Sequence, residues 1–297
     1  MLEIASLRKA KSRLGFLFVA PTMLGIFAFT AGPILFSFAL SFFYWDVLSP
    51  MKFAGLSHYD YIMRDDVAVM TFRNTIYFAF MVVLLQNIIG FSLAMAVRNV
   101  ANKYFRYFFR SVFFLPLIMS GATVSVFMAY FFDTNFGIVN YYLELIGVGS
   151  VRWLTSTDVV LVTTVLVYAW QHIGFTFILF LGGFASIPEE VIDAADVDGL
   201  TGWRKILYVY IPMVSPTIFF SSVIGFIHAV QVFDHPYILT RGGPGDANRT
   251  AVMYIYEKAF QDLEFGYGST LAILLFLIIL IVTALQFYVQ KKWVFYE

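Results

Sequence analysis

Six long stretches of this 297-residue chain contain no Lys, Arg, Asp or Glu. They cover residues 14–43, 74–97, 111–132, 159–181, 212–233 and 265–290. Each stretch is long enough to cross a hydrocarbon core of about 30 Å as a helix, and only a helix satisfies all its backbone polar groups within one lipid-exposed segment. With 60% hydrophobic and 13% charged residues, the composition excludes a soluble domain. The sequence therefore predicts an all-α integral membrane protein with six transmembrane helices.

The positive charges of the chain are concentrated in two tails and two connections. Twelve of the 19 Lys and Arg residues lie in the N-terminal tail, in the second and fourth connections between apolar stretches, and in the C-terminal tail. Basic residues are enriched on the cytoplasmic side of membrane proteins, so we expect both termini in the cytoplasm. The expected domains are a cytoplasmic tail over 1–13, a six-span domain over 14–290 that includes a cytoplasmic loop over 186–212, and a cytoplasmic tail over 291–297.

This cytoplasmic loop is the longest strongly polar segment with a helical pattern. Ser186 and Glu189 have the spacing of a capping box, which predicts the start of a helix. Gly199 can adopt the left-handed conformation that ends such a helix, and a second helix is expected after it. Ala194 and Ala195 would form a ridge of small residues that another protein could approach closely. An ordinary amphipathic loop between two spans would have the same pattern.

The loop also resembles a motif of one known family. Asp193-Ala194-Ala195 is followed after three residues by Gly199, and Val209-Tyr210-Ile211-Pro212 comes nine residues later. The spacing is similar to the EAA loop of ABC-importer permease subunits, in which Glu-Ala-Ala, Gly and Ile-x-Leu-Pro stand at these positions. Three substitutions separate the two patterns: Asp for Glu, Val for Ile and Ile for Leu. All three are chemically mild.

The resemblance implies a fold and a role for the loop. In that family, six helices form the type I importer permease (MetI-like) fold, and the short helix of the loop docks into a groove on a cytoplasmic ATPase. The residues that the resemblance assigns to ATPase coupling are Glu189, Glu190, Asp193, Ala194, Ala195, Asp198, Gly199 and Pro212.

Polar side chains in or beside the apolar stretches are candidates for a solute pathway, because a membrane-embedded polar group is costly unless it has a function or a partner. Aromatic rings beside amides and carboxylates would suit a sugar, whose ring faces are apolar and whose hydroxyls form hydrogen bonds. Hydrogen bonds between neighbouring helices would explain the same residues. The candidates are Gln86, Asn87, Trp170, Gln171, His172, His228, Gln231 and Asp234.

Two loops are expected on the outward side. The first, residues 44–71, mixes aromatic residues with Asp and could be a landing surface for an extracytoplasmic partner or an interfacial aromatic belt. The second follows the fifth apolar stretch and contains a Gly-Gly-Pro turn, which is preset by its residue types alone. That turn also resembles the Thr-x-Gly-Gly-Pro turn of the carbohydrate (maltose and glycerol-phosphate permease-like) branch of the family. The residues that this resemblance assigns to contact with a binding protein are Thr240, Gly242, Gly243 and Pro244.

Several motifs are missing from the sequence. There is no Gly-x-x-x-x-Gly-Lys-Ser/Thr loop to hold nucleotide phosphates and no Gly-x-Ser-x-Gly or His-Glu-x-x-His motif. There is also no cysteine for a thiolate metal site. We therefore expect a non-catalytic subunit with no catalytic residue, metal site or cofactor of its own, and ATP and Mg are expected on partner ATPase subunits.

Together these features predict half of the translocation pathway of an ATP-driven importer for a sugar, oligosaccharide or related polyol, in a prokaryotic cytoplasmic membrane. The implied partners are a second permease, a dimer of ABC ATPases, an extracytoplasmic solute-binding protein, the carbohydrate and the lipid bilayer, with no nucleic acid. The alternatives are a self-contained six-span secondary transporter or channel, and a membrane scaffold. The absence of charged residues from the stretches and of an inverted repeat disfavours the secondary transporter.

Overall fold

The computed structural model describes residues 15–100 and 102–295 of the chain. Its regular structure consists of helices and of one two-stranded sheet. The tail expected over residues 1–13 lies outside the described residues. The helical fold class predicted from the apolar stretches is confirmed.

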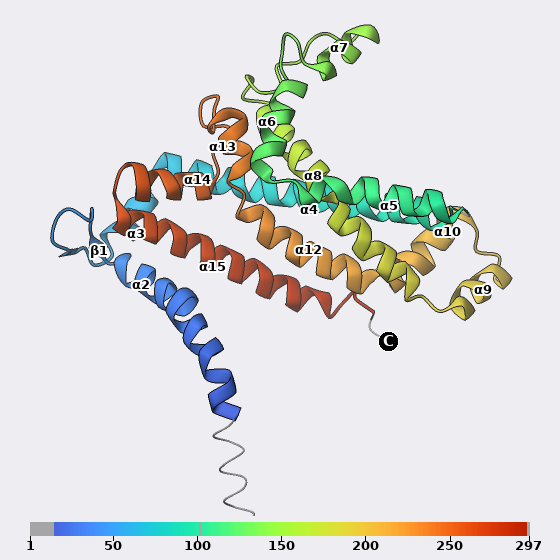
Figure 1. Cartoon of the computed structure of the whole chain (residues 1–297), viewed down its shortest axis with the longest axis horizontal. Coiled ribbons are helices and arrows are strands. Elements are labelled where there is room, and N and C mark those ends of the chain that lie inside the picture. The colour runs from blue at the N-terminus through green and yellow to red at the C-terminus, as the bar shows by residue number, and fades with distance from the viewer. Residues whose placement is uncertain (1–14, 101, 296–297) are drawn as a thin grey trace, which may run out of the picture. The chain divides into compact units, whose positions relative to one another are not determined.

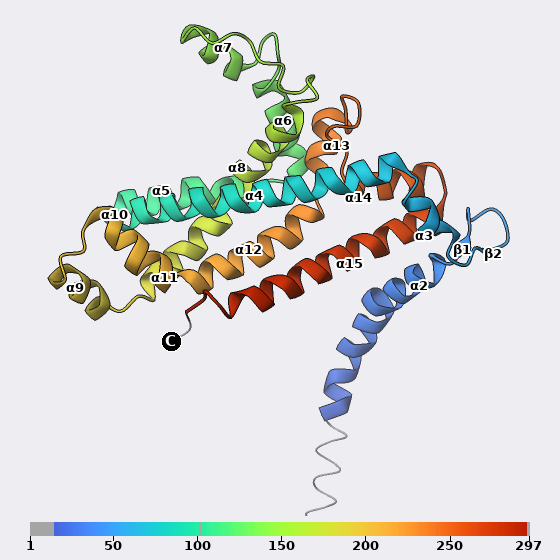
Figure 2. The ribbon, with the colours of Figure 1, turned by 180° about the vertical axis from the view of Figure 1, so that it is seen from behind.

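The chain divides into two compact units. The first unit consists of Met1–Arg64 and Ile255–Leu274, and the second unit consists of Asp65–Tyr254 and Leu275–Glu297. Figures 1 and 2 show the elements of both units from opposite sides. Each unit is described by itself below.

The first unit begins with an apolar helix, Gly15–Leu40, which contains a π-helical turn, η1 (Phe27–Ala31), followed by α2 (Gly32–Leu40). The π turn ends where the Gly32 N–H donates to the Phe27 carbonyl, one residue before Pro33, which has no N–H to continue the α-helical ladder. The other elements are β1 (Phe43–Tyr44), β2 (Lys52–Phe53), α3 (Ser57–Ile62), η3 (Glu257–Gln261) and the first part of α15 (Phe265–Gln290). The two strands pair antiparallel.

The second unit holds most of the helices. They are α4 (Asp66–Arg98), α5 (Lys103–Ile118), α6 (Gly121–Phe131), α7 (Ile138–Leu145), α8 (Val160–Ala185), α9 (Glu189–Val197), α10 (Gly202–Lys205), η2 (Ile206–Tyr210), α11 (Ile211–Met213), α12 (Ser215–Val230) and α13 (Asp234–Thr240). In addition, α14 (Ala251–Tyr256) begins in this unit, and α15 ends in it.

The helix α4 is longer than the apolar stretch that predicted it. It begins at Asp66 because the Asp65 carboxylate caps it, accepting hydrogen bonds from the Val67 and Ala68 N–H groups, each at 3.0 Å. The charged Arg73 lies inside the helix, so the charge-free stretch over 74–97 begins eight residues after the helix does. With 33 residues at about 1.5 Å each, α4 exceeds the thickness of a hydrocarbon core and extends beyond it.

Two of the six apolar stretches fold as bent helix pairs. Four helices are long and apolar enough to cross a membrane, and the count reaches six if each bent pair is one span. The third stretch bends by 102° between α5 and α6, where Met119 and Ser120 are extended and Ser120 caps α6. The fifth bends by 66° before α12, where Pro216 has no N–H for the Pro212 carbonyl and the Ser215 hydroxyl donates to it instead, at 2.7 Å.

The core of the second unit lies between α4, α8 and α12, which run side by side in both views (Figures 1 and 2). Phe177, Phe180 and Val214 are among its fully buried side chains. Small residues bring the helices close together. A Cβ on Gly174 of α8 would collide with the Phe113 carbonyl of α5, so this glycine sets how closely the two helices pack.

Candidate functional site

A polar cavity of about 330 Å³ lies in the second unit, where α8, the end of α12 and the start of α13 meet. We call it the polar cavity. Its lining residues are Gly121, Tyr168, Gln171, His172, His228, Gln231, Val232, Phe233, Asp234 and His235. Five of the eight side chains predicted for a solute pathway therefore come together here.

The buried wall of the polar cavity is formed by two side chains that already have partners. His235 Nε2 donates to the Gln171 Oε1 atom at 2.7 Å, and Gln171 Nε2 donates to the Met119 carbonyl, also at 2.7 Å. Only 3% of each of Gln171 and His235 is exposed. Gln171 therefore links α8 to α13 and to the break between α5 and α6, and it holds the wall in place rather than facing a solute.

His172 lies on the same wall with one ring nitrogen engaged. Its Nδ1 donates to the Tyr168 carbonyl at 2.9 Å, and its ring stacks on the Tyr168 ring with 4.0 Å between centroids. Because Nδ1 carries the hydrogen, Nε2 of the neutral ring is an acceptor. The aromatic face and the ring acceptor together form a surface on which a polar organic solute could lie.

The mouth of the polar cavity carries exposed polar side chains, namely His228, Gln231 and Asp234. They offer hydrogen-bond donors and acceptors beside the ring of Phe233. Gly121 leaves room for one of them, since a Cβ at this position would lie 3.0 Å from the Asp234 carboxylate. Among the described residues, no group of three His, Cys, Asp or Glu side chains could hold a metal ion.

Three predicted pathway residues do not line the polar cavity. Asn87 bonds to its neighbour helix: its Nδ2 donates to Ser222 Oγ at 3.3 Å, and its Oδ1 accepts from Ser221 Oγ at 2.5 Å. Gln86 is buried between helices, and Trp170 is 41% exposed on the surface of α8. The contacts of Asn87 agree with the alternative interpretation, in which these polar residues form hydrogen bonds between neighbouring helices.

Five lining residues were not predicted for the pathway, and Tyr168 and His235 are the two among them whose rings form part of the buried wall. Tyr168 stands one helical turn before His172, so the i, i+4 spacing could have identified it. His235 directly follows Asp234, but nothing in the sequence shows that it turns back toward α8. The contact forms because the Phe233 backbone, with φ −130° and ψ −54°, departs from regular helical geometry between α12 and α13.

The loop over residues 186–212 contains α9, which begins differently from the prediction. Pro188 precedes its first residue, no side chain caps it, and the Ser186 hydroxyl donates to the Gly183 carbonyl at 2.8 Å. The prediction of a capping box is therefore wrong, because Ser186 still belongs to the end of α8. The predicted end is confirmed: Gly199 has φ +74°, and Leu200 N–H donates to the Ala195 carbonyl at 2.9 Å.

The prediction that Ala194 and Ala195 form an accessible ridge on α9 is only half correct. Ala195 is buried, with 5% exposed, because α9 turns this side toward its own chain together with Val191 and Ile192. Ala194 remains exposed on the opposite side, and Val197 is 88% exposed. The other predicted coupling residues that are exposed are Glu189, Glu190, Asp193, Asp198 and Gly199, whereas Pro212 is half-buried in α11.

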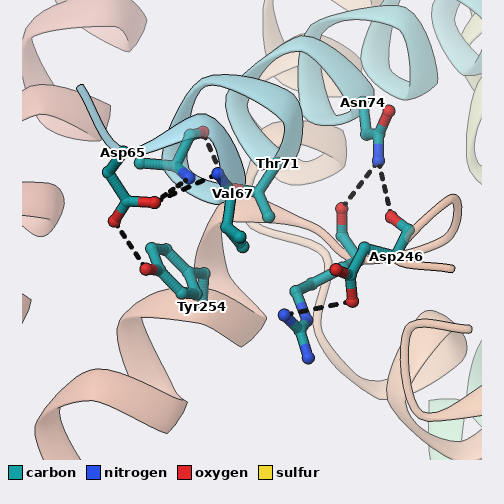
Figure 3. Close-up of polar contacts among 8 residues, drawn as sticks. Asp65, Val67, Thr71, Asn74, Asp246 and Tyr254 are labelled. Carbon is teal, nitrogen blue, oxygen red and sulfur yellow. Dashed lines mark hydrogen bonds and ion pairs between the residues drawn. The ribbon is translucent and has the colours of Figure 1, made fainter. Parts of the chain in front are cut away.

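The Gly-Gly-Pro turn follows α13, and the segment after the turn, residues 246–254, is tied to the start of α4 (Figure 3). Asn74 Nδ2 donates to the carbonyls of Asp246 and Arg249 at 3.0 and 3.1 Å, and the Tyr254 hydroxyl donates to the Asp65 carboxylate at 2.6 Å. All these contacts lie within the second unit. They hold the segment that follows the turn against the start of α4.

Within the turn, the four predicted contact residues divide into two pairs. Thr240 Oγ1 accepts from Asn248 Nδ2 at 2.9 Å, and Gly242 is buried with φ +84°. These two residues shape the turn from inside. Gly243 and Pro244 are half-exposed and are the pair that a partner could reach.

The apolar helices and the bent pairs, together with the polar cavity, define a multi-pass membrane transport protein. The chain belongs to the family of binding-protein-dependent transport system inner membrane components, whose model matches residues 86–294. That match covers most of the chain and includes the polar cavity, α9 and the Gly-Gly-Pro turn.

Relatives and solved structures agree with this assignment. The chain is 29% identical to the lactose transport system permease protein LacF of Rhizobium radiobacter, over 97% of each chain. It is also 29% identical to the probable starch degradation products transport system permease protein AmyD of Thermoanaerobacterium thermosulfurigenes, over 93% of each. A solved bacterial ABC transporter that imports alginate has a chain of the same fold, with a TM-score of 0.83 and 22% identity over 97% of this chain and 99% of that one.

Proposed function

We propose that this chain is a permease subunit of an ATP-driven importer for a sugar, oligosaccharide or related polyol, and that it forms half of the translocation pathway. The observation that carries the solute class is the polar cavity, in which exposed donors and acceptors stand beside the rings of Tyr168 and Phe233. The printed names of several relatives, which include lactose, starch degradation products and arabinooligosaccharides, support a carbohydrate. Non-charged polar solutes suit such a mixture of rings and hydrogen-bonding groups.

In this proposal, α9 transmits the movement of cytoplasmic ATPase subunits, which bind ATP and Mg. Its exposed side, with Ala194 and Val197, faces the ATPase, while its buried side, with Ala195, keeps α9 attached to the rest of the second unit. An ion pair between Lys205 and Asp196, 2.5 Å long, joins α10 to α9. Closure of the ATPases on ATP would thus pull on α9 and alter the helices that surround the polar cavity.

The remaining partners are a second permease subunit, which supplies the other half of the pathway, and an extracytoplasmic solute-binding protein. Gly243 and Pro244 contact the binding protein, because they are accessible and because Asn74 anchors the loop just after them, at the Asp246 carbonyl. The complex lies in a prokaryotic cytoplasmic membrane with both termini of this chain in the cytoplasm, in agreement with the distribution of Lys and Arg.

The test is sugar uptake by the complex that co-purifies with this chain, reconstituted into proteoliposomes. We expect Gln231→Ala and Asp234→Asn each to lower uptake about tenfold, equivalent to about 1.4 kcal/mol of lost interaction. ATPase subunits should still co-purify, because neither residue lies in the cytoplasmic loop. Asp158→Asn, an exposed carboxylate outside the cavity, is the matched control and should transport normally.

Two results would contradict the proposal. Uptake that follows an ion gradient, with no ATPase subunit in the preparation, would favour the self-contained secondary transporter. Unchanged sugar uptake in both cavity variants would show that the solute passes elsewhere.

A further inference from the structure

A second cavity, of about 690 Å³, lies entirely within the first unit. Its walls come from the connection between β1 and β2, from α3 and from the segment that leads into α15. We propose that this loop cavity is a saccharide-binding site, in which uncharged sugar rings pack on aromatic side chains and sugar hydroxyls bond to carboxylates. The inference goes beyond the proposed function, because it concerns binding by the first unit and not passage through the polar cavity.

The base of the loop cavity is rigid. His58, with 7% exposed, donates from Nε2 to the Phe43 carbonyl at 3.1 Å, and its ring packs against Tyr44 with 4.6 Å between centroids. The Phe265 N–H donates to the Trp45 carbonyl at 3.0 Å, which joins the start of α15 to the strand connection. A site whose backbone is already fixed loses little entropy when a ligand binds.

Aromatic side chains give the loop cavity its apolar surface. Tyr44 is 50% exposed and Tyr61 is 54% exposed, and Trp45 also lines the cavity. Tyr61 is held by an edge contact with Tyr267, with 5.2 Å between centroids. Accessible and immobilised rings of this kind provide a large contact area for the C–H faces of a sugar at low entropic cost.

Carboxylates provide directional acceptors beside these rings. Asp46 accepts hydrogen bonds from the backbone N–H groups of Ser49 and Leu48, at 2.7 and 3.1 Å, and this holds its carboxylate at the rim. The hydrogen bond from the Ser49 N–H contributes most to lowering the pKa of Asp46 below its ordinary value, and the bond from Leu48 adds to it. The Asp46 carboxylate therefore stays ionised near neutral pH. The exposed Asp60 carboxylate also lines the cavity and offers two acceptor oxygens to a diol.

Acidic and basic side chains in and beside the loop cavity largely neutralise one another, and this favours an uncharged ligand. Lys258 pairs with Asp262 at 2.9 Å and with Glu264 at 3.2 Å, so these two carboxylates share one cation. Lys52 and Arg64 line the same cavity and balance the remaining two acidic side chains. An anionic ligand would meet an excess of negative charge, and an amine would be repelled by Lys52 and Arg64 and would compete with Lys258 for Asp262 and Glu264. An uncharged polyhydroxylated ligand meets neither penalty.

The experiment uses the full chain in lipid nanodiscs, without a solute-binding protein or ATPase. The chain has five Trp residues, so 5-fluorotryptophan gives five ¹⁹F signals, and Trp45→Phe identifies the signal of the cavity. We expect maltotriose to shift the Trp45 signal saturably. Trigalacturonate and tetramethylammonium, the anionic and cationic probes, should not shift it.

Two variants locate the binding. Tyr61→Ala and Asp60→Asn should each weaken maltotriose binding about tenfold. Tyr141→Ala, a tyrosine with 61% exposed outside this cavity, and Gln231→Ala of the polar cavity should leave the binding unchanged. The other four ¹⁹F signals report whether each variant is folded, and Asp60→Asn changes no described contact, so loss of fold does not obscure the result.

The inference is overturned if maltotriose, lactose and arabinotriose all leave the Trp45 signal unchanged, or if tetramethylammonium shifts it as strongly. It is also overturned if only a solute-binding protein shifts the signal, because the loop cavity would then be a protein interface. Failure of the transport proposal looks different: sugar uptake would be unaffected by polar-cavity variants, while maltotriose would still shift the Trp45 signal.

Discussion

Gly199 adopts a left-handed backbone conformation, with φ +74°, at the end of α9. No side chain or backbone atom lies within 4 Å of the position a Cβ would occupy, so space does not require glycine here. The requirement is conformational, since a left-handed residue costs roughly 1–2 kcal/mol when it carries a Cβ. Residues at this position therefore act on the geometry of the loop without touching a neighbour.

A β-branched residue at this position should disturb coupling more than a small polar one. We expect Gly199→Val to destabilise the end of α9 and to reduce ATP-dependent uptake, whereas Gly199→Asn should keep most of both, because Asn tolerates the left-handed region. The measurement is uptake together with ATPase activity in proteoliposomes. Gly182→Ala is the control, because Gly182 also has open space around it but lies in ordinary helix. Equal activity of the Val and Asn variants would contradict the conformational argument.

At the scale of elements, the contact between α5 and α8 depends on a different kind of glycine. Gly174 has ordinary helical backbone, but a Cβ would collide with the Phe113 carbonyl and would lie 2.9 Å from the Phe114 Cα. Backbone atoms cannot move aside as a flexible side chain does. Gln171, three residues earlier on α8, bonds to the Met119 carbonyl at the bend between α5 and α6, so both contacts join α8 to the same segment.

Gly174→Ala should therefore separate α5 from α8. Overpacking of this kind costs about 1–3 kcal/mol, and we expect a lower Tm in detergent for this variant. Gly182→Ala, eight residues further along the same helix, adds the same methyl group in open space and should leave Tm unchanged. If the two variants melted at the same temperature, the close packing of α5 on α8 would not limit stability.

At the scale of the whole molecule, α9 has one side packed against its own chain and one side exposed. Ala194 and Ala195 are neighbours in sequence, yet only Ala195 is buried. The proposed coupling therefore separates into two experiments on adjacent residues. One substitution tests the partner contact, and the other tests the attachment of α9 to the second unit.

We expect Ala194→Trp to prevent the ATPase from docking while the isolated chain keeps its Tm, because the new side chain points away from the core. Ala195→Trp should lower the Tm of the isolated chain itself, because Ala195 is buried and a large side chain would overpack this side of α9. The measurements are co-purification of ATPase subunits and thermal unfolding of the chain alone. Normal ATPase recovery with Ala194→Trp would contradict docking through this side.

The sequence by itself determined the membrane class, the apolar segments and the loop that contains α9, because hydropathy, charge and turn-forming residues are local properties of the chain. It also located the end of α9 at Gly199, where a single residue type satisfies a backbone requirement. It failed at Ser186, because whether a hydroxyl caps the next helix or ends the previous one depends on where the chain turns.

Only the tertiary structure decided which polar residues meet. Gln171 and His235 are 64 positions apart and share a hydrogen bond, and Asn74 reaches a carbonyl 172 positions away. Such contacts depend on the rotation of each helix about its axis and on the bends after Ile118 and Met213, which no hydropathy pattern contains. The apolar stretches locate the membrane helices along the chain, but packing determines which face of each helix lines the polar cavity.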